Sequence, residues 1–177
     1  HNFARVIISS RLSLRSEAML EWIPDPEKYG RYCDKNLQLL KMEIYTGHIP
    51  EWLSEDDRKA LTAKRRRRII GESEYEGRQG ISGRDSIKIF NTFFTTYAKS
   101  GELIDMAMLC KFFHGQKELK ASIPEGFLDS LLLLYDFSIL QEVKESLYYY
   151  NEEQIDREIL NYMFAVNFEP GATETCN

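Results

Sequence analysis

The sequence has few of the residues that metal sites and nucleophilic active sites require. Its 177 residues include three histidines and three cysteines. The histidines have no partner at the spacing of metal ligands, and Cys33, Cys110 and Cys176 form no C-x-x-C pair. Because the cysteines are odd in number and widely separated, we expect free thiols in a reducing, cytoplasmic compartment. The serines lie mostly at expected helix starts and lack the G-x-S-x-G turn, so neither a metal centre nor nucleophilic catalysis is expected.

A phosphate-binding loop and long apolar runs are missing as well. Gly77, Gly80 and Gly83 are three residues apart, a spacing that matches neither the phosphate-binding loop nor the dinucleotide fingerprint. The H-R-D and D-F-G sequences of protein kinases do not occur. The longest apolar block, Leu131–Leu134 with its flanks, is far too short to span a bilayer. We therefore expect no membrane contact, and no ATP bound by a recognised loop of this chain alone.

Charges of both signs are common, with acidic residues in excess. The chain has 28 acidic and 23 basic residues and a formal net charge of -5, and 43% of its residues are hydrophobic. This balance is typical of a soluble globular protein and disfavours nucleic acid as a partner. The length suffices for one domain or two small ones. Because the sequence is periodic at its first residues and has loop composition at its last, we expect a piece of a longer protein.

Apolar residues recur with helical periodicity, whereas the sustained period-2 alternation of a strand does not occur. The pattern predicts an all-α fold, a multi-helix bundle of about eight helices. Ser54 and Ser82 begin capping boxes, and Asp105 and Asn151 are expected caps. We expect one continuous helical body, with sub-bundles 1–49 and 50–177 as the alternative division. The expected helices cover about residues 3–11, 16–23, 26–47, 54–72, 82–100, 105–115, 124–147 and 151–168.

Two groups of side chains are expected to form much of the core. One is the buried stripe of a single helix and comprises Tyr29, Cys33, Leu37, Leu40 and Ile44. The other is an aromatic cluster between neighbouring helices and comprises Phe90, Phe93, Phe94, Tyr97, Phe112 and Phe113.

The sequence around Arg84 has the pattern of a helix start that carries a cation. Ser82 followed by Asp85 reads as a capping box, which makes Ser82 the N-cap. Arg84 then lies in the first helical turn, where a cation opposes the helix macrodipole. Gly80 and Gly83 flank this arginine and clear space around it. One interpretation is an anionic ligand, with phosphate as the first candidate, and the alternative is an exposed arginine in an ordinary turn between helices.

The strongest run of like charge comprises Lys64, Arg65, Arg66, Arg67 and Arg68. On a helix these side chains point all the way round the axis, so at least one faces the protein body. One interpretation is a solvated helix end whose arginines pair with Glu72, Glu74 and Glu76. The other is an interface or anion-binding role, in contact with a phosphate, a neighbouring subunit or an acidic partner. Nucleic acid is least favoured, because no aromatic residues are interleaved with the run.

The segment Gly80–Arg84 resembles the sensor-2 motif of AAA+ ATPases, in which an arginine at the start of a lid-domain helix reaches the nucleotide phosphates. Gly83 stands where related ATPases commonly have proline. Over nearly its whole length the chain is similar to the C-terminal part of PrkA-type serine protein kinases. Besides the arginine run, the segments that carry this similarity are residues 2–11, 32–34, 41–47, 140–145 and 148–153.

This resemblance implies an AAA+ lid-like region with helical extensions, at the C-terminal side of an ATPase module that lies outside this sequence. On this hypothesis ATP, with Mg, is bound by that module, Gly80, Ser82 and Gly83 lie near it, and Arg84 is the catalytic contact. The chain alone is expected to hold no cofactor and to be inactive. The family is named for serine protein kinase activity and is associated with bacterial stress and sporulation, and an ATP-dependent protease role has also been proposed for it. The implied partners are the ATPase module, a protein substrate and further copies in a homo-oligomer.

A second hypothesis is a non-catalytic interaction or oligomerisation module that recruits a substrate or partner. It rests on the long helix expected from Pro124, the tyrosine cluster Tyr148–Tyr150 and the acidic residues around it. The arginine run would then form one side of an oligomer contact.

Overall fold

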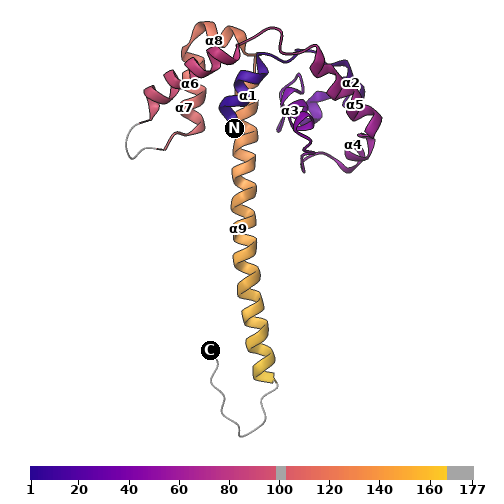
Figure 1. Ribbon diagram of the computed structural model, residues 1–177. Coiled ribbons are helices and arrows are strands. Elements are labelled where there is room, and N and C mark those ends of the chain that lie inside the picture. The colour runs from indigo at the N-terminus through magenta and orange to yellow at the C-terminus, as the bar shows by residue number, and fades with distance from the viewer. Residues whose placement is uncertain (99–102, 167–177) are drawn as a thin grey trace. The chain divides into compact units, whose positions relative to one another are not determined.

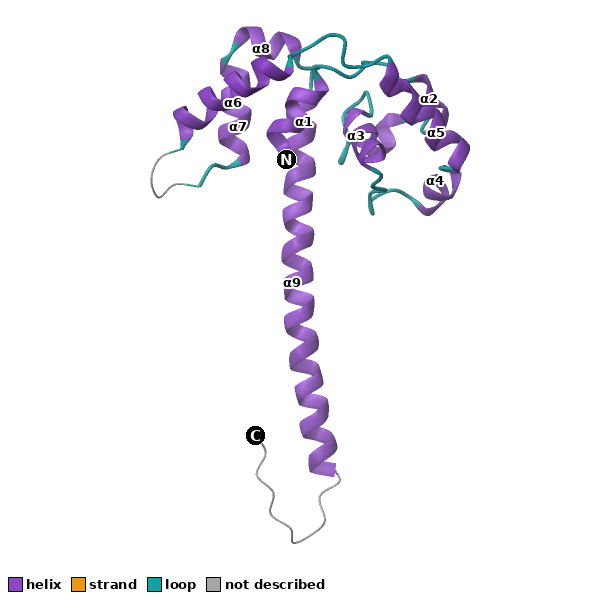
Figure 2. Ribbon diagram, in the orientation of Figure 1, coloured by secondary structure: helices purple, strands orange, loops and turns teal. Residues whose placement is uncertain are grey.

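The computed structural model describes residues 1–98 and 103–166 and confirms the all-α prediction (Figure 1 and Figure 2). In these two ranges the chain forms helices and turns and no strand. It divides into two compact units, His1–Tyr135 and Asp136–Asn177. The α-helices are α1 (Asn2–Ser9), α2 (Glu17–Trp22), α3 (Gln38–Thr46), α4 (Glu55–Ala60), α5 (Ala63–Gly71), α6 (Gly83–Tyr97), α7 (Met106–Gly115), α8 (Lys117–Ser122) and α9 (Phe127–Val166), and the 3-10 helices are η1 (Pro26–Tyr29) and η2 (Glu72–Glu74).

Several helices begin at the predicted caps. Ser54 Oγ accepts a hydrogen bond from Asp57 N, and Asp105 Oδ1 accepts one from Met108 N at 2.7 Å. These side chains satisfy N–H groups that the first turn of a helix leaves without a partner. The predicted starts of α4 and α7 are thereby confirmed.

The single helix predicted for residues 26–47 is wrong, because a turn separates η1 from α3. The carboxylate of Asp34 closes this turn by accepting hydrogen bonds from Asn36 N and Leu39 N. Leu37 has a φ of 56°, in the left-handed region that a right-handed helix does not use. The predicted buried stripe is nevertheless confirmed, since all five of its side chains are buried.

The helix predicted for residues 54–72 is also interrupted. α4 ends at Ala60, and Thr62 Oγ1 accepts a hydrogen bond from Arg65 N to begin α5. A local cap therefore interrupts a stretch, residues 54–70, that contains no proline or glycine. The short helix α8 lies between the helices predicted for residues 105–115 and 124–147, where no helix is expected.

Helices α1, α2, α3 and α5 pack together in the first unit, and α6, α7 and α8 pack in sequence. Phe3 of α1 joins the two groups, because its ring centroid lies 6.0 Å from that of Phe93 and 5.7 Å from that of Phe113. The predicted aromatic core is only partly correct. Phe93, Phe112 and Phe113 are buried, but Phe90 and Phe94 are exposed, because Phe93 and Tyr97 are the rings of α6 that pack against Phe112 of α7.

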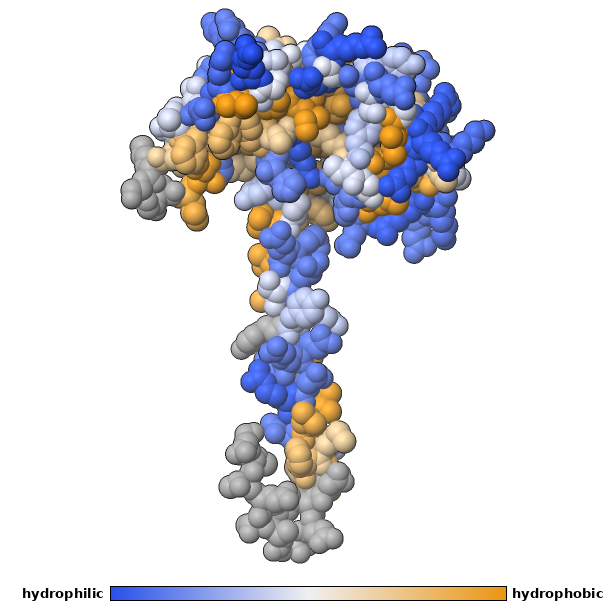
Figure 3. Space-filling model, viewed as in Figure 1, coloured by the Kyte–Doolittle hydropathy of each residue, from blue (hydrophilic) through white to orange (hydrophobic). Residues whose placement is uncertain are grey.

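In the second unit the predicted break at Asn151 is wrong, because α9 continues through it. No proline or glycine occurs between Gly126 and Pro170, so this stretch contains no helix breaker. An apolar spacing of four residues also continues through position 151, and these side chains are exposed, as Figure 3 shows at the C-terminal end of α9. Ile139, Val143 and Leu147 precede Asn151 in this pattern, and Ile155, Ile159, Tyr162 and Val166 follow it. The predicted helix end at Phe168 lies outside the described residues.

The core of the first unit contains a charged side chain, Lys41, that is 1% exposed. Its Nζ lies 2.6 Å from Glu72 Oε2 and 2.6 Å from Glu76 Oε1. The hydroxyl of Tyr45 donates to Glu76 Oε2 at 2.7 Å, and its ring centroid lies 5.6 Å from the ammonium group. Pairing of this kind is what makes a buried charge tolerable, so the network ties α3 to η2 and to the segment that follows it.

Two pKa shifts follow from this network. Burial alone would raise the pKa of Glu72, but hydrogen bonds from Lys41 and Ser16 outweigh burial and lower that pKa below its usual value. Burial is the main cause that raises the pKa of Tyr45, and the hydrogen bond to Glu76 raises it further. Glu72 is therefore ionised and Tyr45 protonated at neutral pH, which are the states that the hydrogen bonds require.

We predict that Lys41→Met lowers the free energy of unfolding by about 3–5 kcal/mol, because it leaves Glu76 buried without its cation. Urea denaturation followed by circular dichroism measures this change. The matched control is Lys59→Met, which removes an exposed ion pair to Glu55 and is expected to cost less than about 1 kcal/mol. Equal losses in the two variants would contradict the structural role of Lys41.

Candidate functional site

α6 begins with the predicted capping box. Ser82 Oγ accepts a hydrogen bond from Asp85 N at 3.1 Å and donates one to Asp85 Oδ2 at 2.6 Å. The hydrogen bond from Ser82 is the main cause that lowers the pKa of Asp85. Lys88, whose Nζ lies 3.5 Å from Asp85 Oδ1, lowers this pKa further. An ionised carboxylate is thus held at the helix start, where it complements the helix dipole.

Arg84 lies in the first turn of α6, as predicted, and is exposed. Within the described residues its side chain forms no hydrogen bond and no ion pair. The nearest carboxylate along the chain, that of Asp85, is engaged by Ser82 and Lys88. The guanidinium group is therefore open to an anion that comes from outside this unit.

The two glycines that flank Arg84 have different surroundings. Gly80 has a φ of 84°, and a Cβ at this position would lie 2.1 Å from the carbonyl oxygen of Ser10. Any side chain there would clash with the backbone at the end of α1. A Cβ at Gly83, in contrast, would meet nothing within 4 Å. Gly80 thus permits the close contact with α1, whereas Gly83 leaves open space beside Arg84.

Several hydrogen bonds fix the turn before α6 to the end of α1. The guanidinium group of Arg11 donates to the carbonyl oxygens of Gly77 and, at 2.9 Å, of Ile81. The N–H of Gly77 donates back to the carbonyl oxygen of Arg11 at 3.0 Å, and the N–H of Ile81 donates to Ser10 Oγ at 3.1 Å. Because Ser82 follows Ile81 directly, these bonds determine where α6 and its first turn begin.

The arginine run occupies the N-terminal half of α5, and its side chains point to separate partners. Arg65 donates to the carbonyl oxygen of Ala60. Arg68 forms an ion pair with Glu21 of α2. Arg66 is partly buried. These arginines therefore help to hold α5 in place, and in the described part of the chain no hydrogen bond or ion pair joins the run to the turn before α6.

The other members of the run, Lys64 and Arg67, are exposed. The interpretation in which the arginines pair with Glu72 and Glu76 is wrong, because both carboxylates contact Lys41 instead. Lys41 reaches them from α3 and is buried with them, whereas the run projects from the start of α5.

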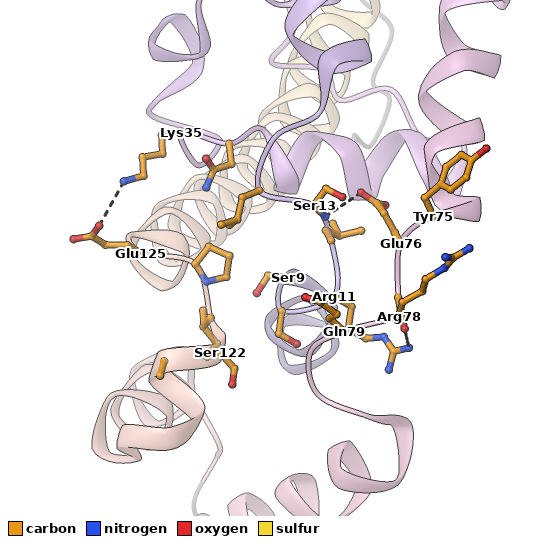
Figure 4. Close-up of a pocket in the computed structure, with 18 residues that line it drawn as sticks. Ser9, Arg11, Ser13, Lys35, Tyr75, Glu76, Arg78, Gln79, Ser122 and Glu125 are labelled. Carbon is orange, nitrogen blue, oxygen red and sulfur yellow. Dashed lines mark hydrogen bonds and ion pairs between the residues drawn. The ribbon is translucent and has the colours of Figure 1, made fainter.

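A groove of about 850 Å³ lies next to the turn before α6 (Figure 4). Figure 4 shows Lys35 and Glu125 on one side and Tyr75 and Arg78 on the other, with Arg11 between them. Sequence reasoning missed this groove, because no single segment carries a signal for it. Its lining comes from residues 9–14, 35–36, 75–79 and 121–125.

The described cysteines are not activated nucleophiles. Burial is the main cause that raises the pKa of the Cys33 thiol well above its usual value, and burial also raises the pKa of Cys110.

Within residues 1–98 and 103–166, no group of His, Cys, Asp or Glu side chains could hold a metal ion. No helix in the same ranges has the length and apolar character needed to cross a membrane. Cys176 lies outside the described residues.

The chain is thus an all-α region in which the exposed Arg84 lies in the first turn of α6, a helix capped by Ser82. Residues 39–177 match the family model of the PrkA serine protein kinase C-terminal domain. The chain belongs to this family, and the resemblance found in the sequence is confirmed. No curated protein and no solved structure matches the chain.

We predict that Gly80→Ala lowers the free energy of unfolding by about 2 kcal/mol or more, because the new Cβ clashes with Ser10 and the backbone keeps a positive φ. Gly83→Ala is the matched control. It is expected to change stability by about 1 kcal/mol or less, because alanine suits a helix and the space is open. Thermal or urea unfolding of both variants checks this, and a neutral Gly80→Ala would refute the contact with α1.

Proposed function

We propose that Arg84 contacts a phosphate group of ATP, bound with Mg²⁺ on an N-terminal ATPase module of the parent protein, and couples this helical region to hydrolysis. The observation that carries the proposal is the exposed guanidinium group in the first turn of a capped helix, without an ion-pair partner in the described residues. The free N–H groups of a first helical turn also attract anions. An arginine so placed stabilises the charge that spreads over phosphate oxygens during hydrolysis.

An apolar stripe on α6 beside Arg84 supports this proposal. Ile87, Phe90 and Phe94 are 64%, 44% and 51% exposed. Their spacing of three and four residues puts them on one side of the helix, and Ile87 follows Arg84 by three positions. Exposed apolar side chains gathered on one face are typical of a surface that another protein module covers. Covering this stripe would bring the partner module within reach of Arg84.

The proposal extends to the parent protein through its family. The family name indicates a serine protein kinase, so the substrate we propose is a protein. The setting we propose is the bacterial cytoplasm. Gly80, Ser82 and Gly83 would shape the turn that carries Arg84 toward the nucleotide. The free thiols of Cys33 and Cys110 suit a reducing compartment.

We predict that Arg84→Ala in the full-length parent protein lowers ATP turnover by about tenfold or more, because a charge that stabilises the transition state is lost. The unfolding midpoint should stay unchanged, because the side chain is exposed. Arg31→Ala, also an exposed arginine, is the matched control and should leave turnover unchanged. Unchanged turnover in Arg84→Ala, or a stoichiometric ATP complex of residues 1–177 alone, would remove the assignment.

A second candidate function, protein interaction or oligomerisation through α9, is favoured by a separate observation. Residues 136–166 of the second unit contain seven acidic and two basic residues. The apolar stripe Ile155, Ile159, Tyr162 and Val166 is exposed and spaced by four, three and four residues, the pattern of helix pairing. A helix in a protein gains most of its stability by packing its apolar face against another element. This exposed stripe therefore supports a role in binding another helix.

For this second candidate we predict that Ile159→Asp converts a self-associated chain into a monomer, because it places a charge in the apolar stripe. Sedimentation velocity measures the change. Asn161→Asp adds the same charge away from the stripe and should leave the association intact. If the unmodified chain sediments as a monomer, or if both variants behave alike, oligomerisation through this stripe is refuted.

A further inference from the structure

The groove beside the turn before α6 has walls that are already fixed in place. The guanidinium group of Arg11 donates to the carbonyl oxygens of Gly77 and Ile81. The N–H of Ser13 donates to Glu76 Oε1 at 3.1 Å, which joins the segment after α1 to the opposite wall. A ligand that enters such a groove does not have to order the walls, so little of its binding energy is lost.

The groove carries an excess of positive charge that a ligand can use. Arg11 and Arg78 form no ion pair within the described residues. The carboxylate of Glu76 contacts Lys41 at 2.6 Å and shares that cation with Glu72, and the lining of the groove has three basic residues against two acidic ones. Lys35 lies 3.6 Å from the 94% exposed side chain of Glu125, and a surface pair of this kind exchanges partners at little cost.

The size and the spread of these charges indicate the kind of ligand. A volume of about 850 Å³ is in the range of sites for organic ligands and far exceeds that of a small ion. The basic groups lie on opposite sides of the groove, with Lys35 on one side and Arg78 on the other (Figure 4). The lining also includes apolar side chains, namely Leu12, Leu14, Ile123 and Pro124. A ligand that suits this lining has several separated anionic groups together with apolar or small groups.

We infer that this groove binds an extended, acidic peptide segment of a protein partner. The alternating side chains of an extended peptide place carboxylates at intervals along its length, which one compact anion does not do. Its backbone amides find acceptors and donors in the loop segments that form the walls. This binding role is independent of Arg84 and of the proposed contact with ATP.

The test measures fluorescence anisotropy of a labelled peptide that alternates glutamate with serine, titrated with residues 1–177. A second peptide has glutamine in place of every glutamate. The acidic peptide is expected to bind about tenfold or more tightly than the glutamine peptide, with an affinity that falls as salt is added. Amide chemical shifts of Gln79 and Ser122 are expected to move on binding, since both residues line the groove.

Charge-reversal variants locate the binding. Arg78→Glu is expected to weaken binding of the acidic peptide by about tenfold or more, because an exposed cation of the groove becomes an anion. Lys59→Glu, an exposed site on α4 that does not line the groove, is the matched control and should change the affinity less than about twofold. Arg84→Ala should leave the affinity unchanged, so failure of the ATP proposal and failure of this inference are distinguishable.

Several outcomes would overturn the inference. They are equal affinity for the two peptides, equal effects of Arg78→Glu and Lys59→Glu, and shifts that map away from the groove. Displacement of the peptide by an equimolar amount of ATP would also overturn it, because the groove would then prefer a compact phosphate ligand. Circular dichroism of each variant shows whether the fold is intact, and both substituted residues are exposed.

Discussion

The first unit depends on one buried cation. The ammonium group of Lys41 comes from α3, whereas its carboxylate partners Glu72 and Glu76 come from η2 and from the segment that follows it. Separating these elements would leave buried charges without partners, which costs far more than the loss of a surface ion pair. The same carboxylate of Glu76 accepts a hydrogen bond from Ser13 N, so the segment after α1 is held in the same network. One side chain thus determines how three parts of the chain meet.

The position of the turn before α6 follows from this network. Once Glu76 is fixed, Gly77 comes next along the chain and exchanges hydrogen bonds with Arg11. The backbone then passes so close to α1 that only glycine fits at position 80. The start of α6, and with it the direction of Arg84, is therefore set by contacts that lie outside the helix itself. The groove is bounded by the same contacts, which explains why it adjoins the turn.

The sequence predicts features that depend on neighbouring residues and misses those that depend on distant ones. The capping box of Ser82 and the cap at Asp105 could be read because a cap needs only the next few residues. The interruption at Asp34 escaped prediction because apolar periodicity continues across it, and the one at Thr62 because residues 54–70 contain no proline or glycine. The expected cap at Asn151 misplaced a helix boundary, although the apolar spacing of four continues through that position. The groove, built from four separate segments, and the ion pairs of Lys41 leave no local pattern in the sequence.

The apolar series along α9 has a geometric consequence. At about 100° per residue, each spacing of four moves the apolar side chain about 40° around the helix, so the series from Ile139 to Ile159 winds around α9 instead of staying on one flank. A straight neighbour that runs along α9 can cover only part of this series. Complete coverage requires either a neighbour that winds around the helix or two neighbours docked on opposite flanks, and in the second arrangement α9 acts as a spacer between two bound proteins.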